Sequence, residues 1–226
     1  MFNDDLDNSQ SIAPVGMPFS QACENNKQPI LEILQQELQG FNHVLEVGSG
    51  TGQHSVYFAP RLAHLTWQTS DVLAHHAIIN AWHTVYPAPN LYAPRAFDLA
   101  VDSLPMSLAS NQPYDAVFTA NTLHIISWSL VEKLFELVVD ALPINGKLIV
   151  YGPFNENGHY TSAGNQQFDI SLQQRDPKSG IRHLEDIIAL ANTHMLKLSD
   201  KYAMPANNQL LVFQKIGVMD KIHAKK

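Results

Sequence analysis

The chain has almost no cysteine and few basic residues. Its single thiol, Cys23, cannot form an internal disulfide and has no Cys or His neighbour at zinc-ligand spacing, which suits a small buried side chain in a reducing cytosol. Fourteen Lys and Arg residues stand against twenty-one Asp and Glu residues, so the net charge is −7. This charge repels phosphate backbones and anionic lipid, and we expect neither nucleic acid nor a membrane as partner.

The sequence has no long apolar run, and its first residues lead us to expect no export signal. Its first residues, Phe2-Asn3-Asp4-Asp5, supply neither a basic region nor an apolar stretch, and runs such as 137–144 are far shorter than the ~20 residues that span a bilayer. The eleven histidines are scattered, and none forms a metal-binding pattern such as H-E-x-x-H. We therefore expect a cytoplasmic protein that uses no metal.

What is present is enough apolar sequence for one domain. The 226 residues are 45% hydrophobic, which is ordinary for a globular α/β protein of this length. Residues 1–18 are polar and interrupted by proline and glycine, so we expect a flexible N-terminal arm. Residues 217–226 are expected to form a frayed tail. The domain itself is then 19–216.

Apolar runs of strand length alternate with helical patterns through this domain. Strands that are apolar on both faces and separated by helices predict a parallel sheet covered on both sides. The last two runs are joined by the short turn 204–208, which predicts an antiparallel final strand. We expect a Rossmann-like α/β fold with a seven-stranded, mostly parallel sheet and an antiparallel last strand. The predicted strands are 44–47, 65–69, 94–97, 116–120, 147–151, 195–202 and 209–214.

Helix signals accompany these strands. Pro29 is placed to open a helix that Gly40 ends, and Ser129 with Glu132 forms a capping box for another helix. The polar segment 152–183 lacks a long apolar run, and we expect either a lid over the substrate or a static loop with a short helix near 166–174. Further helices are expected at 52–62, 73–85 and 184–191.

A glycine-rich turn follows the first predicted strand. The sequence Glu46-Val47-Gly48-Ser49-Gly50-Thr51-Gly52-Gln53 leads from a strand into a helix, where glycine lets the backbone approach a ligand closely and the helix N-terminus offers N–H groups. A dinucleotide fingerprint would require glycine at the position of Gln53, which argues against a pyrophosphate ligand. A purely structural glycine turn remains an alternative at this stage.

The pattern acidic-x-Gly-x-Gly-x-Gly resembles the first motif of class I S-adenosylmethionine-dependent methyltransferases. Asp71, at the end of the next strand, could accept hydrogen bonds from both ribose hydroxyls, or could merely N-cap the following helix. The resemblance further implies that Asp98 and Leu99 lie near the adenine. The residues expected to bind S-adenosyl-L-methionine are Glu46, Gly48, Ser49, Gly50, Thr51, Gly52, Asp71, Asp98, Leu99 and Asn121.

Much of the chain also resembles a methyltransferase-like domain family found in bacteria and animals. The resemblance runs from about 19 to 215 and is carried by the glycine loop together with 19–31, 121–128, 151–158 and 204–208. One departure is Asn25, where the family pattern leads us to expect Arg. The resemblance implies the methyltransferase fold and its cofactor, but no particular substrate.

The segments that follow the fourth and fifth strands should face the transferred methyl group, since ligands of open α/β sheets lie at the carboxyl ends of the strands. Asn121 is not followed by the Pro-Pro-aromatic sequence typical of enzymes that methylate amides or adenine. His124 could equally be a structural histidine, and His159 a surface one. The candidate catalytic residues are His124, Glu156, His159 and Tyr160.

The sequence therefore predicts S-adenosylmethionine-dependent methyl transfer to a small-molecule acceptor. Two alternatives stay open: a non-catalytic module that binds the cofactor and acts through a partner, and a nucleotide-dependent oxidoreductase, against which Gln53 argues. The oligomeric state is not indicated.

Overall fold

The structure, a computed structural model, describes residues 17–109 and 113–217. The expected arm and tail therefore lie outside the described residues except for Met17, Pro18 and Gly217. Pro18, which we assigned to the arm, accepts a 2.9 Å hydrogen bond from Trp82 Nε1. The packed domain thus includes Pro18.

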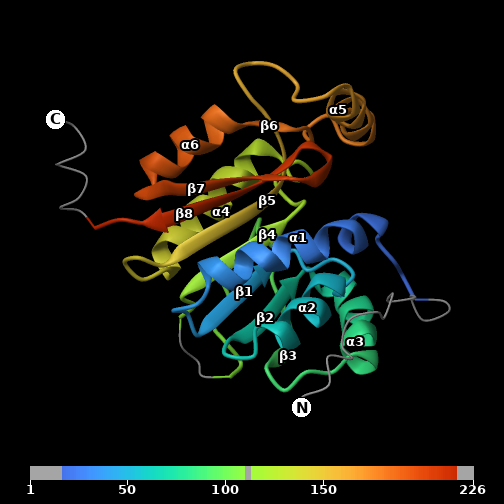
Figure 1. Ribbon diagram of the computed structural model, residues 1–226, viewed down its shortest axis with the longest axis vertical. Coiled ribbons are helices and arrows are strands. Elements are labelled where there is room, and N and C mark those ends of the chain that lie inside the picture. Colours follow the sequence, from blue (N-terminus) through green and yellow to red (C-terminus); the bar gives the residue numbers. More distant parts are fainter. Residues whose placement is uncertain (1–16, 110–112, 218–226) are drawn as a thin grey trace, which may run out of the picture.

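The strands of the described residues form one eight-stranded sheet in the order β3-β2-β1-β4-β5-β8-β7, with the two-residue β6 paired to β5 alone (Figure 1). Pairs from β3 to β5 are parallel, whereas β8 is antiparallel to both β5 and β7. This confirms the Rossmann-like fold and adds β6, which is too short to give a sequence signal. The strands are β1 (His43–Val47), β2 (Thr66–Asp71), β3 (Leu91–Ala96), β4 (Ala116–Ala120), β5 (Lys147–Asn155), β6 (Arg182–His183), β7 (Leu196–Met204) and β8 (Asn208–Lys215).

Helices cover both faces of the sheet because each strand of the centre is apolar on both sides. One core cluster joins α1 and α2 to the sheet, and the other joins α4 and α6 to the opposite face (Figure 1). Burial of this kind stabilises by roughly 25 cal/mol per Å² of apolar surface. The helices are α1 (Gln21–Glu37), α2 (Gln53–Phe58), η1 (Ala59–Arg61), η2 (Leu73–His75), α3 (His76–Val85), α4 (Trp128–Ala141), α5 (Ala163–Arg175), α6 (Leu184–Thr193) and η3 (Pro205–Asn207).

Two predicted helix starts are wrong. Helix α1 begins eight residues before Pro29, at Gln21, where Ser20 caps it by accepting a hydrogen bond from the Cys23 amide. Pro29 lies inside the helix, where packing against the sheet outweighs the lost hydrogen bond. Helix α4 is capped by Ser127 and not by Ser129, since the Ser127 hydroxyl accepts from the Leu130 amide.

The strand order changes direction between β1 and β4. Both are parallel, yet the chain continues from β1 to β2 on one side and from β4 to β5 on the other. Crevices at such switch points are the usual ligand sites of open α/β sheets. The loops that leave the carboxyl ends of β1, β2, β4 and β5 all meet there.

No helix among residues 17–109 and 113–217 combines the length and the apolar character needed to cross a bilayer.

Candidate functional site

The glycine loop between β1 and α2 holds three left-handed backbone conformations, at Gly48, Gly50 and Gly52 (φ +72°, +59° and +86°). Side chains would be strained at each. A Cβ on Gly52 would come within 3.2 Å of Ile79 Cα, so this glycine lets α2 and α3 approach. A Cβ on Gly50 would meet no heavy atom within 4 Å among the described residues. The loop is therefore open to a ligand at Gly50.

The amides of this loop are largely bonded within the protein. Gly48 N and Ser49 N both donate to the Ser70 carbonyl, at 3.0 and 3.1 Å, and Gly50 N donates to Asp71 Oδ2 at 2.7 Å. Gly52 N donates to the Ser49 carbonyl at 2.9 Å. These four loop amides are therefore already bonded within the protein. A pyrophosphate needs such donors, which weighs further against a dinucleotide.

Asp71 lies at the carboxyl end of β2, directly beside the loop. Its Oδ2 accepts from Gly50 N, while Oδ1 accepts from Val72 N at 2.7 Å and faces His75 Nδ1 at 2.8 Å. The alternative that Asp71 caps the next helix is wrong, because Val72 occupies the cap of η2 and neither η2 nor α3 has a side-chain cap. The carboxylate is 9% exposed and ties the loop to β2. Both carboxylate oxygens of Asp71 already have protein partners, so the predicted hydrogen bonds from ribose hydroxyls would be additional bonds to the same oxygens.

Two other predicted cofactor ligands lie beneath the loop. Glu46 is 2% exposed, and its Oε2 accepts a 2.8 Å hydrogen bond from Trp67 Nε1. Burial raises the pKa of Glu46 to about 8, so the carboxyl is mostly protonated at neutral pH. Ser49 donates through Oγ to the Glu46 carbonyl and accepts from Ser70 N. Both side chains hold the loop from below instead of facing its open side.

The remaining predicted cofactor residues lie at neighbouring strand ends. Thr51 Oγ1 donates to Gln53 Oε1 at 3.0 Å. Asp98 follows β3, is exposed, and accepts the Ala100 amide within its own turn, while Leu99 packs against the α4 side of the core. Asn121 follows β4 in a left-handed conformation, with φ +57°. Cofactor contacts at these positions stay predictions.

The N-terminal part of α1 crosses the start of α2, which the sequence did not reveal. Ser20 N donates to Gln53 Oε1 at 2.6 Å, and Gln53 Nε2 donates back to the Ser20 carbonyl at 3.3 Å. In the next turn, Asn26 Oδ1 lies 2.6 Å from His54 Nε2. Because burial lowers the pKa of His54 to about 4, its ring is neutral and donates to Asn26. Gln53 thus has a structural use at the position where dinucleotide-binding proteins carry glycine.

His124 lies at the opposite side of the switch point, after β4. It is 5% exposed, and Nδ1 would be 3.6 Å from a Cβ on Gly152. Its ring meets the Phe168 ring edge-on at a centroid distance of 5.3 Å. Burial, with smaller contributions from the Arg182 and Arg175 charges, lowers the pKa of His124 to about 4. No group in the described part of the chain hydrogen-bonds to the ring, so it can accept a proton from a ligand.

The other catalytic candidates lie along the end of β5. Glu156 accepts from Lys201 at 2.9 Å and from Gln209 at 2.7 Å, and the Lys201 bond holds the pKa of this carboxyl below its usual range. His159 is exposed and pairs with Glu156 only through the backbone. Tyr160 donates to Asp169 Oδ2 at 2.7 Å. The structure does not bring these three side chains into contact with His124.

The segment 152–183 is more regular than expected. It contains the end of β5, the 13-residue helix α5 and β6, so the short helix predicted near 166–174 is part of α5. On α5, Phe168 and Ile170 are 37% and 41% exposed, as is Tyr160 before it at 40%. Of these three side chains, Phe168 is the one that contacts the His124 ring. Closure of the segment as a lid stays a prediction.

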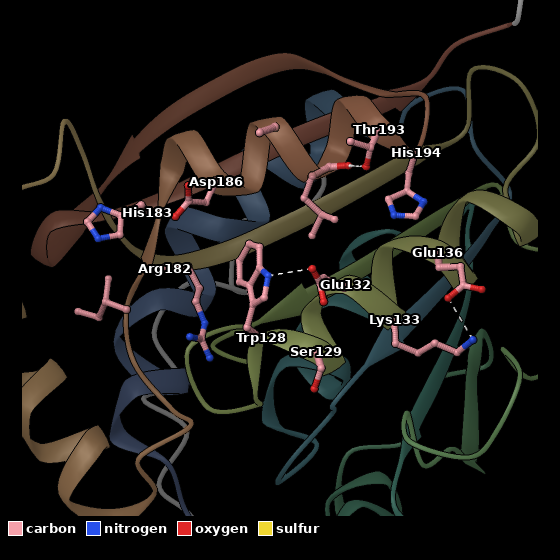
Figure 2. Close-up of a pocket in the computed structure, with 13 residues that line it drawn as sticks. Trp128, Ser129, Glu132, Lys133, Glu136, Arg182, His183, Asp186, Thr193 and His194 are labelled. Carbon is pink, nitrogen blue, oxygen red and sulfur yellow. Dashed lines mark hydrogen bonds and ion pairs between the residues drawn. The ribbon is translucent and has the colours of Figure 1, made fainter.

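A separate open groove lies between α4 and α6 (Figure 2). Trp128, Glu132 and Asp186 face it, and the Trp128 indole donates to Glu132 within α4. None of the residues predicted to bind the cofactor lines this groove. Within the described ranges, no group of three or more His, Cys, Asp and Glu side chains is arranged to hold a metal ion.

Solved structures with the same fold include methyltransferases. An O-methyltransferase family protein from Burkholderia thailandensis superposes with a TM-score of 0.71 at 13% identity, over 85% of this chain and 57% of that one. Human N-acetylserotonin methyltransferase in complex with S-adenosylmethionine gives 0.74 at 12%, over 87% and 53%. An O-methyltransferase family 2 protein from Planctomyces limnophilus, in complex with apigenin, gives 0.72 at 18%, over 86% and 58%.

This chain therefore spans little more than half the length of those proteins, and the likeness is one of fold. A family profile described as "Protein of unknown function (DUF938)" matches residues 17–215, which include every strand and helix given above. On that match, the chain belongs to the DUF938 family.

Proposed function

We propose that this protein is an S-adenosylmethionine-dependent methyltransferase that acts on a hydroxyl group of a small molecule. The observation that carries the proposal is the glycine loop at the switch point, open at Gly50 and joined to Asp71 through the Gly50 amide. The fold, shared with methyltransferases, is consistent with it. The proposed domain is 19–216 together with Pro18, in a cytoplasmic protein.

The residues around the loop suit an adenosine and a sulfonium better than a pyrophosphate. Four loop amides are already bonded, while a carboxylate, Asp71, lies where ribose hydroxyls would approach. Next to it, Val72 and Leu73 are 36% and 73% exposed and could cover an adenine ring. Asn121 and Gly48 would border the methionine end, which S-adenosylmethionine needs close to β4.

When bound, S-adenosylmethionine supplies a methyl group on a sulfonium, which a nucleophile can displace in line. The protein must then align the acceptor and, for a hydroxyl, remove its proton. His124 can accept that proton, since its ring is neutral and has no other hydrogen bond in the described chain. The half-exposed Phe168 ring, which meets the His124 ring edge-on, would contact an apolar acceptor next to it. Two of the structural relatives are named O-methyltransferases, and one was solved with apigenin, which agrees with a small hydroxyl-bearing acceptor.

Titration calorimetry with S-adenosylhomocysteine tests the cofactor site. Hydrogen bonds to a charged group contribute roughly 1.5–3 kcal/mol, so Asp71→Ala should weaken binding about ten- to hundred-fold. Asp115→Ala is the matched control. Its Oδ2 also accepts two backbone amides, those of Asn42 and His43, but at the amino end of β1. We expect this control to bind normally.

A structure with S-adenosylhomocysteine tests the acceptor side. The proposal requires the sulfur to face the space between Asn121 and His124. A sulfur directed away from His124, or a nucleotide seated in the α4–α6 groove, would contradict it. Binding by the wild type with no loss in Asp71→Ala would remove Asp71 from the site.

A further inference from the structure

The loop that carries His124 is held almost entirely by the segment before β6. Residues 122–126 form a turn after β4, in which the Ile125 and Ile126 amides both donate to the Thr122 carbonyl. The carbonyls of this turn point outward from β4 and need partners elsewhere. They find them in residues 179–182, which end in β6 and lie more than fifty positions later in the sequence.

Arg182 makes the central contact. Its Nε donates to the Leu123 carbonyl at 3.0 Å, and its Nη2 donates to the Ile126 carbonyl, so one guanidinium joins both ends of the His124 turn. Figure 2 shows Arg182 extending from β6 toward the loop that precedes α4, beside Trp128. None of the described acidic side chains forms an ion pair with Arg182. Its donors are used on backbone carbonyls instead.

Two further bonds act on the residues between those ends. Gly180 N donates to the His124 carbonyl at 2.9 Å, and Ser179 Oγ donates to the Ile125 carbonyl at 2.5 Å. All four carbonyls from Leu123 to Ile126 therefore accept hydrogen bonds from 179–182. Such a continuous set fixes the backbone position of a side chain more closely than packing alone.

The same segment is attached to α5 through a buried carboxylate. Asp169 is 4% exposed, and its Oδ1 accepts the Ile181 amide at 2.6 Å, while Oδ2 accepts from Tyr160 and Gln173. Helix α5 is thus connected to the His124 turn by hydrogen bonds through residues 180–182 as well as by the Phe168 ring.

We propose that Arg182 is a positioning residue, which holds the His124 turn so that the imidazole stays buried against Gly152 and Phe168 beside the acceptor. This inference rests on the proposed function, in which His124 receives the acceptor proton. It makes the segment 179–182 part of the catalytic apparatus without contact with substrate or cofactor.

The experiment compares three variants by amide hydrogen exchange and by NMR titration of the His124 ring. Arg182→Lys keeps the charge but loses the two-pronged geometry, and Arg182→Gln loses both. Arg175→Gln is the matched control, because Arg175 also lowers the pKa of His124 by its charge but donates only to Ser171 in its own helix. Exchange at Val117 in β4 reports global stability.

We expect both Arg182 variants to speed exchange of the Ile125, Ile126 and Gly180 amides about ten- to hundred-fold, with Val117 unchanged. In Arg182→Lys the pKa of His124 should rise, since the ring becomes more exposed while the charge is kept. Arg175→Gln should leave the loop exchange at its wild-type rate.

Wild-type exchange at Ile125 and Ile126 in Arg182→Lys would overturn the proposal. Equal acceleration at Val117 would also overturn it, because Arg182 would then only stabilise the fold. Neither readout needs a cofactor or an acceptor. A failure of S-adenosylhomocysteine to bind the wild type would instead refute the proposed function and leave the result on Arg182 standing.

Discussion

Glu46 gives the sharpest test of the electrostatics beneath the glycine loop. Its carboxyl is buried against Trp67, and burial raises its pKa from 4.5 to about 8. A group whose pKa is raised in the folded state binds a proton more tightly there than in the unfolded chain. Its contribution to stability is therefore complete at pH values below the pKa that Glu46 has in the unfolded chain. This contribution is lost as the pH rises through the pKa that Glu46 has in the folded protein.

The size of the effect follows from proton linkage. Between about pH 5 and 8 the folded protein holds one more proton at Glu46 than the unfolded chain, so its stability falls by about 1.4 kcal/mol per pH unit. Glu46→Gln has no proton to lose, and its amide oxygen can still accept from Trp67. The wild type should thus lose roughly 2–3 kcal/mol more than the variant between pH 5 and pH 7.

The assay is urea denaturation of both proteins across this pH range. Three histidines, His54, His83 and His124, have pKa values that desolvation lowers to about 4. They change stability in the opposite direction, but equally in both proteins. The difference between the two curves therefore isolates Glu46. Parallel curves for wild type and Glu46→Gln would show that the carboxyl is ionised throughout, and would refute the reasoning.

Three further predictions concern the open side of the site. Gly50→Val should abolish S-adenosylhomocysteine binding in calorimetry, because the side chain would fill the space that is empty above the loop and oppose the positive φ. Gly158→Val is the control, because Gly158 also has a positive φ and open space around it but lies in the turn after β5. This variant should bind S-adenosylhomocysteine normally. An equal loss of binding in both variants would argue against the glycine loop as the site. Asn155 ends β5 and Tyr160 follows five residues later, where both side chains would contact the acceptor and not the adenosine. Removal of either side chain should therefore lower turnover more than cofactor affinity, as kinetics and calorimetry together would show. If 152–183 is a lid, its α5 amides should exchange more slowly when S-adenosylhomocysteine and acceptor are both bound than with S-adenosylhomocysteine alone.

The features that could be predicted from the sequence are those that depend on a few adjacent residues. The apolar runs and the turn at 204–208 identified the sheet and its antiparallel edge, and the glycine spacing identified the loop, because both follow from backbone requirements of a few adjacent residues. The same local view failed at α1. Pro29 is an unfavourable residue inside a helix, and only the packing of the helix on the sheet explains why it is tolerated.

The site was less predictable because its contacts join distant residues. The role of Arg182 could not be predicted from the sequence. Its partners are backbone carbonyls of the loop after β4, and every residue has such a carbonyl whatever its side chain. The bond between Asn26 and His54 likewise depends on how α1 crosses α2. Glu46 was expected at the cofactor because of its place before the glycines, but alternation along β1 points it below the loop, beside Trp67.

The internal bonding of the glycine loop has a kinetic consequence. A loop whose amides at Gly48, Ser49, Gly50 and Gly52 are already paired has few conformations to lose when a ligand arrives. Association with the nucleoside should then be a single fast phase, without a slower step in which the backbone becomes ordered. The residence time of the ligand would be governed by the contacts that it makes with its surroundings, and substitutions at the site should change the dissociation rate far more than the association rate.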